Sequence, residues 1–211
     1  LFNYVLTYFG HWRYLLNERR PAVIATTSAV EEVEGYVNVV HYKSRETMEH
    51  LRAILEEDPE ALVVILGDHL PYLGPNFAAY VESGILSGSL SDFDGAMMRR
   101  YVSTPLIVVD GSRGPVPLGA IPAYRVPALI LYLLEVGAPT MWDFTRQPEG
   151  LKIRPLPGMT LVLDRNDRPV VCYSEDSDPV CDLALQWRRS VTILNSDIFS
   201  GRRHALTMMG S

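Results

Sequence analysis

Apolar and polar positions along the first half of the chain predict buried strands separated by helices. Residues 3–9 are β-branched and aromatic with no interior breaker, which is typical of a buried strand. Residues 61–66 and residues 105–109 are nearly continuous apolar runs of strand length, and such runs are typical of parallel strands covered on both faces. The pattern therefore predicts three buried strands in a mainly parallel sheet.

Apolar residues at three- and four-residue steps predict a long amphipathic helix from about Val30 to Glu57. Its expected apolar face consists of Val33, Val37, Val40, Ser44, Met48, Leu51 and Leu55. Asp58-Pro59 should end this helix, because the residue before a proline is disfavoured in the helical conformation. A second helix is predicted from Ala123 to Val136. Strand, helix and strand in this order form a βαβ unit, whose crossover should be right-handed.

The last third of the chain predicts a small antiparallel appendage. Residues 151–163 are proline-rich and then strand-like, and residues 165–173 are typical of a hairpin turn followed by a strand. Residues 182–192 are expected to be helical. The expected fold class is therefore α/β, with residues 1–150 forming the main part and residues 151–211 a small α+β appendage that completes the same domain.

Charge and hydropathy exclude some classes of protein. The net charge of -6 argues against a nucleic-acid-binding protein, which usually has a basic face. No apolar stretch reaches the roughly 20 residues that cross a bilayer. The chain begins at Leu1 without an initiator Met and already in a strand-like run, so we expect an excised fragment. A fragment that lacks strands of its sheet would expose an edge, which pairing with another chain could cover.

The two cysteines, Cys172 and Cys181, flank the polar, turn-rich residues 174–178. They could close a small disulfide ring, as is common in an oxidising compartment, or remain two unpaired thiols. Both possibilities stay open at this point. A zinc site is not expected, because no second Cys/His pair is within reach along the sequence.

The strongest candidate for chemistry is Asp68-His69, which follows Gly67 at the end of the second predicted strand. Ligands of open parallel sheets bind beyond the carboxyl ends of the strands, where His11 and Asp110 would also lie. A carboxylate next to an imidazole suits Mn²⁺, Mg²⁺, Zn²⁺ or Ca²⁺. The alternative is that Asp68 caps the next helix while His69 makes a structural hydrogen bond.

The other candidates have plainer interpretations. His11 could be a rim residue, although adjacent parallel strands would bring it near Asp68-His69. Asp110 is interpreted as a turn residue. Surface or helix-packing roles are expected for His41, His50 and His204. The sequence contains no Walker-type loop and no Gly-x-Ser-x-Gly motif, and nothing marks a Ser or Thr as an activated nucleophile.

Several segments resemble the later half of the sulfatase/alkaline-phosphatase superfamily. They are residues 8–14 (Tyr-Phe-Gly-His-Trp-Arg-Tyr), 36–42, 64–71 (Val-Ile-Leu-Gly-Asp-His-Leu-Pro), 104–108 and 195–201. Within the superfamily, the likeness is greatest to the membrane-anchored phosphoglycerol transferases, which comprise lipoteichoic acid synthases and the enzymes that decorate periplasmic glucans. The resemblance implies an alkaline-phosphatase-like α/β/α sandwich, with residues 1–150 as part of its catalytic domain.

The resemblance also implies roles for individual residues. Asp68 and His69 would bind the catalytic divalent cation, Mn²⁺ or Mg²⁺ in a transferase and Ca²⁺ in a true sulfatase. His11 would match the family histidine that contacts the substrate phosphate. The family's nucleophile, a Thr or a formylglycine-forming Cys or Ser, would lie upstream of Leu1, as would its acidic metal ligand, so the fragment alone should be inactive. Arg13 stands where relatives often have Pro.

The implied activity is transfer of a phosphoglycerol or related phosphoalkyl group from a phospholipid head-group donor to a glycan or glycolipid acceptor. It would take place at the periplasmic face of the inner membrane, in a membrane-anchored parent protein. One alternative on the same fold is a sulfatase or phosphodiesterase, and another is a non-enzymatic role as a folded remnant or partner-binding domain. The nucleophile of the parent would separate the first two, since Thr favours transfer and Cys-x-Pro-x-Arg favours sulfate ester hydrolysis.

Overall fold

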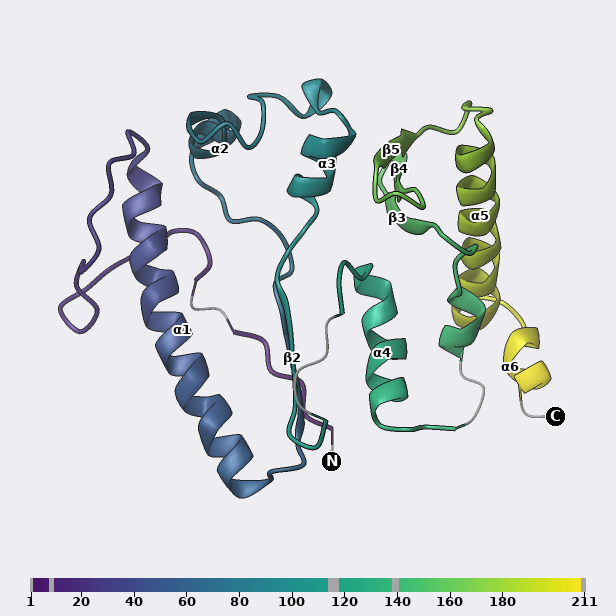
Figure 1. The fold of residues 1–211 in the computed structure, drawn as a ribbon, viewed down its shortest axis with the longest axis horizontal. Helices are drawn as coiled ribbons and strands as arrows, with labels where there is room; N and C mark the ends of the chain where they lie inside the picture. The colour runs from purple at the N-terminus through teal and green to yellow at the C-terminus, as the bar shows by residue number, and fades with distance from the viewer. Residues whose placement is uncertain (1, 8–9, 114–117, 138–140, 210–211) are drawn as a thin grey trace. The chain divides into compact units, whose positions relative to one another are not determined.

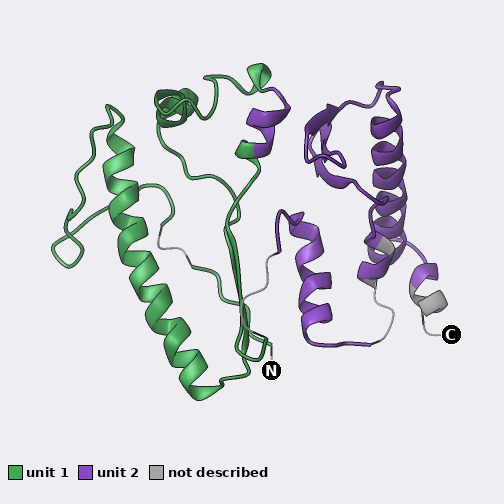
Figure 2. Cartoon of the chain, viewed as in Figure 1, with its two compact units in different colours: residues 1–93, 100–116 green, residues 94–99, 117–211 purple. Residues whose placement is uncertain are grey.

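The computed structural model describes residues 2–7, 10–113, 118–137 and 141–209, which fold as a mixture of helices and small sheets (Figure 1). The chain divides into two compact units (Figure 2). Unit 1 comprises residues 1–93 and 100–116, and unit 2 comprises residues 94–99 and 117–211. The assignment of residues 1–150 to a catalytic α/β domain stays a prediction.

Unit 1 contains a long helix and a two-stranded sheet. Its elements are α1 (Glu31–Glu57), β1 (Leu62–Leu66), the 3₁₀ helix η1 (Pro75–Phe77), α2 (Ala78–Glu82), the 3₁₀ helix η2 (Leu90–Asp92), the end of α3 (Gly95–Tyr101) and β2 (Leu106–Asp110). The prediction of α1 is confirmed to within one residue. Its first turn carries Glu31, Glu32 and Glu34. Acidic side chains at this end stabilise a helix, because they face the positive end of its dipole.

The two strands of unit 1 pair antiparallel, so the predicted parallel arrangement is wrong. Leu66 lies opposite Leu106, and Leu62 lies opposite Asp110. The intervening chain folds into short helices and re-enters the sheet at the end from which it left, so no crossover is needed. An apolar run indicates a strand but does not indicate whether the paired strand runs parallel or antiparallel to it. The sequence pattern therefore could not predict the direction of β2. Asp110 therefore lies at the opposite end of the ladder from Asp68-His69.

The first predicted strand, residues 3–9, is not a strand where the structure describes it. Residues 2–7 belong to no helix or strand, and residues 8–9 lie outside the described part. The side chains are turned to solvent, with Phe2 and Val5 each 78% exposed. Aromatic and β-branched residues favour a strand, but a strand also needs a partner, and none of the described residues pairs with this segment. The predicted βαβ unit is consequently not formed.

The buried face of α1 differs in part from the predicted one. Its buried residues are Asn38, Val39 and Leu51, while Val40 and Met48 are 39% and 46% exposed. The polar side chain of Asn38 is fully buried because it bonds to the preceding loop. Its Oδ1 accepts the backbone N–H groups of Val23 and Ile24 at 2.7 and 2.9 Å. Its Nδ2 donates to the carbonyls of Ile24 and Glu34 at 2.7 and 2.9 Å.

Unit 2 is a three-stranded antiparallel sheet with flanking helices, as the predicted appendage required. Its elements are η3 (Ala123–Arg125), α4 (Val126–Leu133), η4 (Met141–Thr145), β3 (Lys152–Leu156), β4 (Met159–Leu163), β5 (Pro169–Cys172), α5 (Pro179–Phe199) and α6 (His204–Met209). The strands lie in the order β3-β4-β5. The helices predicted at 123–136 and 182–192 and the turn at 165–167 are all present, with shifted bounds.

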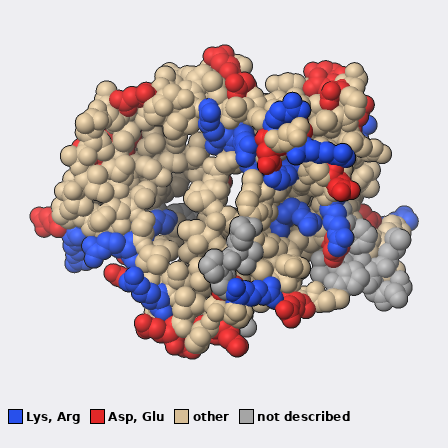
Figure 3. All heavy atoms as spheres, in the orientation of Figure 1, with Lys and Arg blue, Asp and Glu red and all other residues tan. Residues whose placement is uncertain are grey.

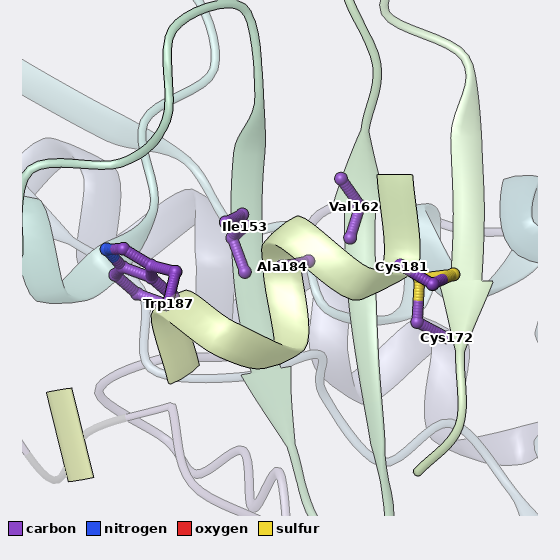
Figure 4. Close-up of a cluster of buried hydrophobic side chains, with 6 residues drawn as sticks. All are labelled: Ile153, Val162, Cys172, Cys181, Ala184 and Trp187. Atoms are coloured by element: carbon purple, nitrogen blue, oxygen red, sulfur yellow. A yellow bond between two sulfur atoms is a disulfide. The ribbon is translucent and has the colours of Figure 1, made fainter. Parts of the chain in front are cut away.

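The core of unit 2 lies between α5 and the sheet (Figure 4). It consists of Ile153, Val162, Cys172, Cys181, Ala184 and Trp187. A disulfide joins the two cysteines, which decides the question that the sequence left open. Asp178 caps α5, since its side chain accepts the N–H groups of Val180 and Cys181. The cap and the disulfide together fix the start of α5 against β5.

Candidate metal-binding loop

Asp68-His69 lies in the loop that follows β1, as predicted. Both side chains are exposed, His69 to 66% and Asp68 to 84%. The Nε2 atom of His69 lies 3.4 Å from Oδ2 of Asp68. The Nδ1 atom of His69 lies 2.7 Å from the carbonyl oxygen of Leu70. Because a carbonyl oxygen only accepts, Nδ1 carries the proton in this contact, and Nε2 faces the carboxylate of Asp68, with which a protonated ring forms an ion pair.

The separation of the two donor atoms suits ligands of one ion. Two ligands bound at about 2.1 Å lie about 3.0 Å apart in an octahedral shell and about 3.4 Å apart in a tetrahedral one. The contact between Nδ1 of His69 and the Leu70 carbonyl is the kind that orients metal-binding histidines. However, no group of three His, Cys, Asp or Glu side chains gathers among the described residues. Among the described residues, Asp68 and His69 therefore stand as a pair of donors without a third side chain of these types beside them.

The alternative interpretation of this dipeptide is partly correct. Asp68 does not cap a helix: its Oδ1 accepts the N–H of His69 at 2.9 Å, and the next helix, η1, begins only at Pro75. His69 does make the structural hydrogen bond to Leu70. That bond uses Nδ1 alone, and Nε2 lies beside the carboxylate of Asp68.

Gly67 and Thr104 fix the start of the loop. The N–H of Gly67 donates to the carbonyl of Pro105 at 3.1 Å, which extends the β1–β2 ladder by one bond. The hydroxyl of Thr104 donates to the carbonyl of Gly67 at 2.8 Å. A Cβ atom at Gly67 would lie only 3.2 Å from Cβ of Thr104, so a larger residue would push the strands apart here. The glycine therefore allows the close approach that positions Asp68.

Two tyrosine hydroxyls hold the next part of the loop. Tyr80 donates to the carbonyl of Pro71 at 2.7 Å, and Tyr14 donates to the carbonyl of Tyr72 at 2.8 Å. The ring of Trp12 also meets the ring of Tyr72 edge-on, with 5.3 Å between centroids. The segment that carries His11 is thereby fastened to the loop that carries Asp68-His69, although it arrives there without the predicted parallel strands.

His11 lines a hollow of about 240 Å³ in unit 1. The other lining residues are Gly10, Arg13, Leu15, Asn17, Arg20 and Val39. A Cβ atom at Gly10 would lie 3.4 Å from Nζ of Lys43, which places a further cation beside the hollow. Nδ1 of His11 donates to the carbonyl of Trp12 at 2.7 Å, which leaves Nε2 as the acceptor of the neutral ring. Basic side chains around a histidine suit an anionic group such as a phosphate.

Burial keeps the hydroxyls of Tyr80, Tyr14 and the neighbouring Tyr36 protonated. It raises the pKa of Tyr80 to about 12, and it also raises the pKa values of Tyr14 and Tyr36 above the ordinary range. Their hydroxyls therefore remain donors at every pH at which the protein would be studied. The sequence singled out neither Tyr14 nor Tyr80 as a site residue, because no local pattern marks a tyrosine that bonds to a distant carbonyl.

The remaining candidates take no part in this loop. Asp110 is a turn residue as predicted, since its Oδ1 accepts the N–H groups of Ser112 and Arg113 and the hydroxyl of Ser112. His50 and His204 are exposed, as expected for surface residues. Basic and acidic side chains are interspersed on the face of the molecule seen in Figure 3.

Comparison with known proteins finds no matching family model, no matching curated protein and no matching solved structure. The resemblance to the sulfatase superfamily thus rests on the residues quoted above. Among the helices of the described residues, none is long and apolar enough to cross a membrane.

Proposed function

We propose that this chain is the later portion of a metal-dependent transferase of the sulfatase superfamily. The enzyme would move a phosphoglycerol or related phosphoalkyl group from a phospholipid to a glycan or glycolipid acceptor. One observation carries the proposal: Asp68 and His69 present donor atoms 3.4 Å apart in a loop that is fastened to the segment bearing His11. Phosphoryl transfer uses a divalent cation together with groups that bind the phosphate oxygens, and these two segments would supply one of each.

The donor set fits part of a divalent-metal site. The carboxylate oxygen and the imidazole nitrogen would bind Mn²⁺ or Mg²⁺ in a transferase once they close from 3.4 Å to the roughly 3.0 Å of an octahedral shell, and Ca²⁺ would replace these ions in a true sulfatase. Two protein donors do not fill a coordination shell, so the proposal includes further ligands outside the described residues. When bound, the ion would lower the pKa of a hydroxyl nucleophile and neutralise charge on the phosphoryl oxygens.

The residues of this chain would perform three tasks. Asp68 and His69 hold the cation. Because Nδ1 of His11 already donates to the carbonyl of Trp12, its Nε2 would contact the phosphate group, and would donate to a phosphate oxygen only from a protonated ring. Arg13 beside the hollow would compensate the phosphate charge, while Arg20 pairs with Glu46 at 2.6 Å. The nucleophilic hydroxyl is proposed to lie in residues that precede Leu1 in a parent protein, so the chain as given would bind without turning over.

The proposed location is the periplasmic face of the inner membrane, with the parent anchored in the bilayer beside its phospholipid donor. The disulfide between Cys172 and Cys181 supports this location, because disulfides persist in oxidising compartments and are rare in the cytosol of mesophiles. The acidic balance of the chain, with a net charge of -6, supports the prediction that nucleic acid is not a partner.

Paramagnetic NMR with Mn²⁺ tests the metal site directly. Resonances of Asp68 and His69 should broaden at Mn²⁺ concentrations that leave those of His50 sharp. His50 is a matched control, because its Nδ1 also contacts a backbone carbonyl, that of Glu46 at 2.7 Å. Asp68→Asn and His69→Gln should each remove the selective broadening, whereas His50→Gln should preserve it. Broadening that spares Asp68-His69, or that survives both variants, would refute the metal site.

A second titration tests the phosphate site. With Mg²⁺ present, glycerol phosphate should shift the ring resonances of His11 at lower concentration than inorganic sulfate does. His11→Gln should abolish the change at neighbouring Gly10. A preference for sulfate would favour the sulfatase alternative, and no response to either anion would contradict the assignment of His11.

A further inference from the structure

The loop at residues 70–73 belongs to no helix or strand, yet each of its four backbone carbonyls accepts a hydrogen bond from the protein. The donors are Nδ1 of His69, the hydroxyl of Tyr80, the hydroxyl of Tyr14 and the N–H of Ala79, in the order of the carbonyls. Surface loops usually leave many such groups to water and are mobile in consequence. A loop whose carbonyls are all bonded has a fixed path.

We propose that Tyr14 and Tyr80 are positioning residues that hold Asp68-His69 in its metal-binding arrangement. They act through the carbonyls of Tyr72 and Pro71, to which their hydroxyls donate. The inference rests on the proposed function, because it assigns these tyrosines to the same site. Binding groups must be held by neighbours that are themselves fixed, and an exposed dipeptide on an irregular loop lacks such support from its own backbone.

Tyr80 is anchored as such a role requires. It lies on α2 and is only 9% exposed. Its own carbonyl accepts the N–H groups of Ile85 and Leu86 at 2.8 and 3.2 Å, so its backbone is fixed by the turn that follows the helix. The hydroxyl that bonds to Pro71 is therefore carried by a residue whose backbone is fixed.

Tyr14 is anchored by α1. Its ring packs edge-on against the ring of Tyr36, with 5.3 Å between centroids. A Cβ atom at Gly35 would lie 3.0 Å from the carbonyl oxygen of Tyr14, so the helix presents its one glycine at this close approach. Glycine is unfavourable inside a helix, and this close approach gives a physical reason for it here.

The chain contains a matched control for a tyrosine that bonds to a carbonyl. The hydroxyl of Tyr42 on α1 donates to the carbonyl of Pro21 at 2.8 Å, in a different loop. Tyr42→Phe removes the same kind of bond as Tyr80→Phe does, without touching residues 70–73. A general loss of stability would therefore affect all three tyrosine variants, whereas a positioning role would single out Tyr14 and Tyr80.

NMR of the 211-residue chain separates these outcomes. The N–H of Ala79 bonds to the carbonyl of Leu73, so its hydrogen exchange reports opening of the loop. Exchange at Ala79 should rise about fivefold for each hydroxyl removed, since one net hydrogen bond is lost each time. In the Tyr14→Phe/Tyr80→Phe double variant, at least threefold more Mn²⁺ should be needed to broaden His69, because the binding-competent loop is less populated. Tyr42→Phe should change neither value.

The outcomes assign failure to one proposal or the other. If the resonances of wild-type His69 do not broaden with Mn²⁺, the metal-site proposal fails. The proposal that Tyr14 and Tyr80 position a metal site then fails as well. If wild-type His69 broadens but the double variant needs the same Mn²⁺ concentration, only the positioning role is overturned. An equal effect of Tyr42→Phe would also overturn it, because the role would then be merely structural. Restoring tyrosine at position 80 in the double variant should recover part of the Mn²⁺ response.

Discussion

Removal of the Asn38 side chain should weaken unit 1. Its side chain is fully buried in α1 and makes four hydrogen bonds of 2.7 to 2.9 Å. Two of these satisfy the backbone N–H groups of Val23 and Ile24, in a loop that the structure shows without helix or strand at those positions. Asn38→Ala removes all four bonds at once.

The magnitude follows from the partners that are left behind. An intramolecular hydrogen bond contributes about 1 kcal/mol net, and a buried donor left unpaired costs about 1 to 3 kcal/mol. The loop is only partly buried, so water would reach some of the freed groups. We therefore expect Asn38→Ala to lower the free energy of unfolding of unit 1 by about 3 kcal/mol, which is a large share of the 5 to 15 kcal/mol typical of a domain.

Urea denaturation followed by the NMR cross-peaks of α1 amides measures this loss. With a slope of about 1 to 3 kcal/mol per molar urea, the midpoint for α1 should fall by about 1 to 3 M. Asn195→Ala makes the same chemical change at an exposed position of α5, and it should alter stability by no more than about 0.5 kcal/mol. A loss at Asn38 no larger than the one at Asn195 would refute the reasoning that buried side-chain bonds hold this loop.

Three further predictions concern other parts of the chain. Replacing both Cys172 and Cys181 by serine should lower the free energy of unfolding of unit 2 by about 2.5 kcal/mol, the value expected for a disulfide that joins residues 9 positions apart. Urea denaturation followed by tryptophan fluorescence measures this loss. Gly111→Ala should destabilise the β1–β2 sheet by about 1 to 3 kcal/mol, because its Cβ would collide with the carbonyl oxygen of Pro59; an unchanged melting temperature would contradict this. Hydrogen bonds from the backbone N–H and then from the guanidinium of Arg168 lower the pKa of Asp164 in the folded protein below the ordinary value of 3.8. The carboxylate therefore contributes its full stabilisation above pH 3.8, and this stabilisation is lost as the pH falls through the lower pKa of the folded state. The stability of Asp164→Asn should thus fall less steeply than that of the wild type in acid unfolding monitored by circular dichroism.

Elements that depend on neighbouring residues were predicted well from the sequence. The start and end of α1 follow from helical periodicity and from Pro59, and the β4–β5 turn follows from polar residues at 165–167. These signals are local, because each turn of a helix or hairpin is closed by residues a few positions apart. The face of α1 was predicted less well, since the most buried position carries Asn38, a polar residue whose partners lie in another loop.

Features that depend on distant partners were not predictable in the same way. The apolar run at residues 105–109 was rightly recognised as a strand, but its antiparallel direction depends on the path of the 39 residues between β1 and β2. Residues 2–7 have strand-forming side chains and still make no ladder. Burial pattern and β propensity therefore identify candidate strands without choosing their partners.

The candidate site combines both kinds of information. The place of Asp68-His69 directly after a strand could be read from the sequence, because an apolar run followed by Gly67 marks the end of that strand. The contact between Tyr14 and Tyr72 spans 58 positions, and the contact between Tyr80 and Pro71 depends on how α2 turns back. Neither hydrogen bond produces a repeating pattern in the sequence, so the bonds that hold the loop could be found only in the structure.

Unit 1 has only a two-stranded sheet among its described residues, and a ladder of that size is marginal alone. Its irregular segments are held instead by polar side chains that bond to backbone groups, as Asn38 does for Ile24, Tyr42 for Pro21 and Tyr80 for Pro71. It follows that a Tyr→Phe replacement at such a position should loosen the particular loop that the hydroxyl holds, although it preserves volume and hydrophobicity. The tolerance of unit 1 to substitution should therefore follow side-chain bonding to the loops more closely than apolar burial.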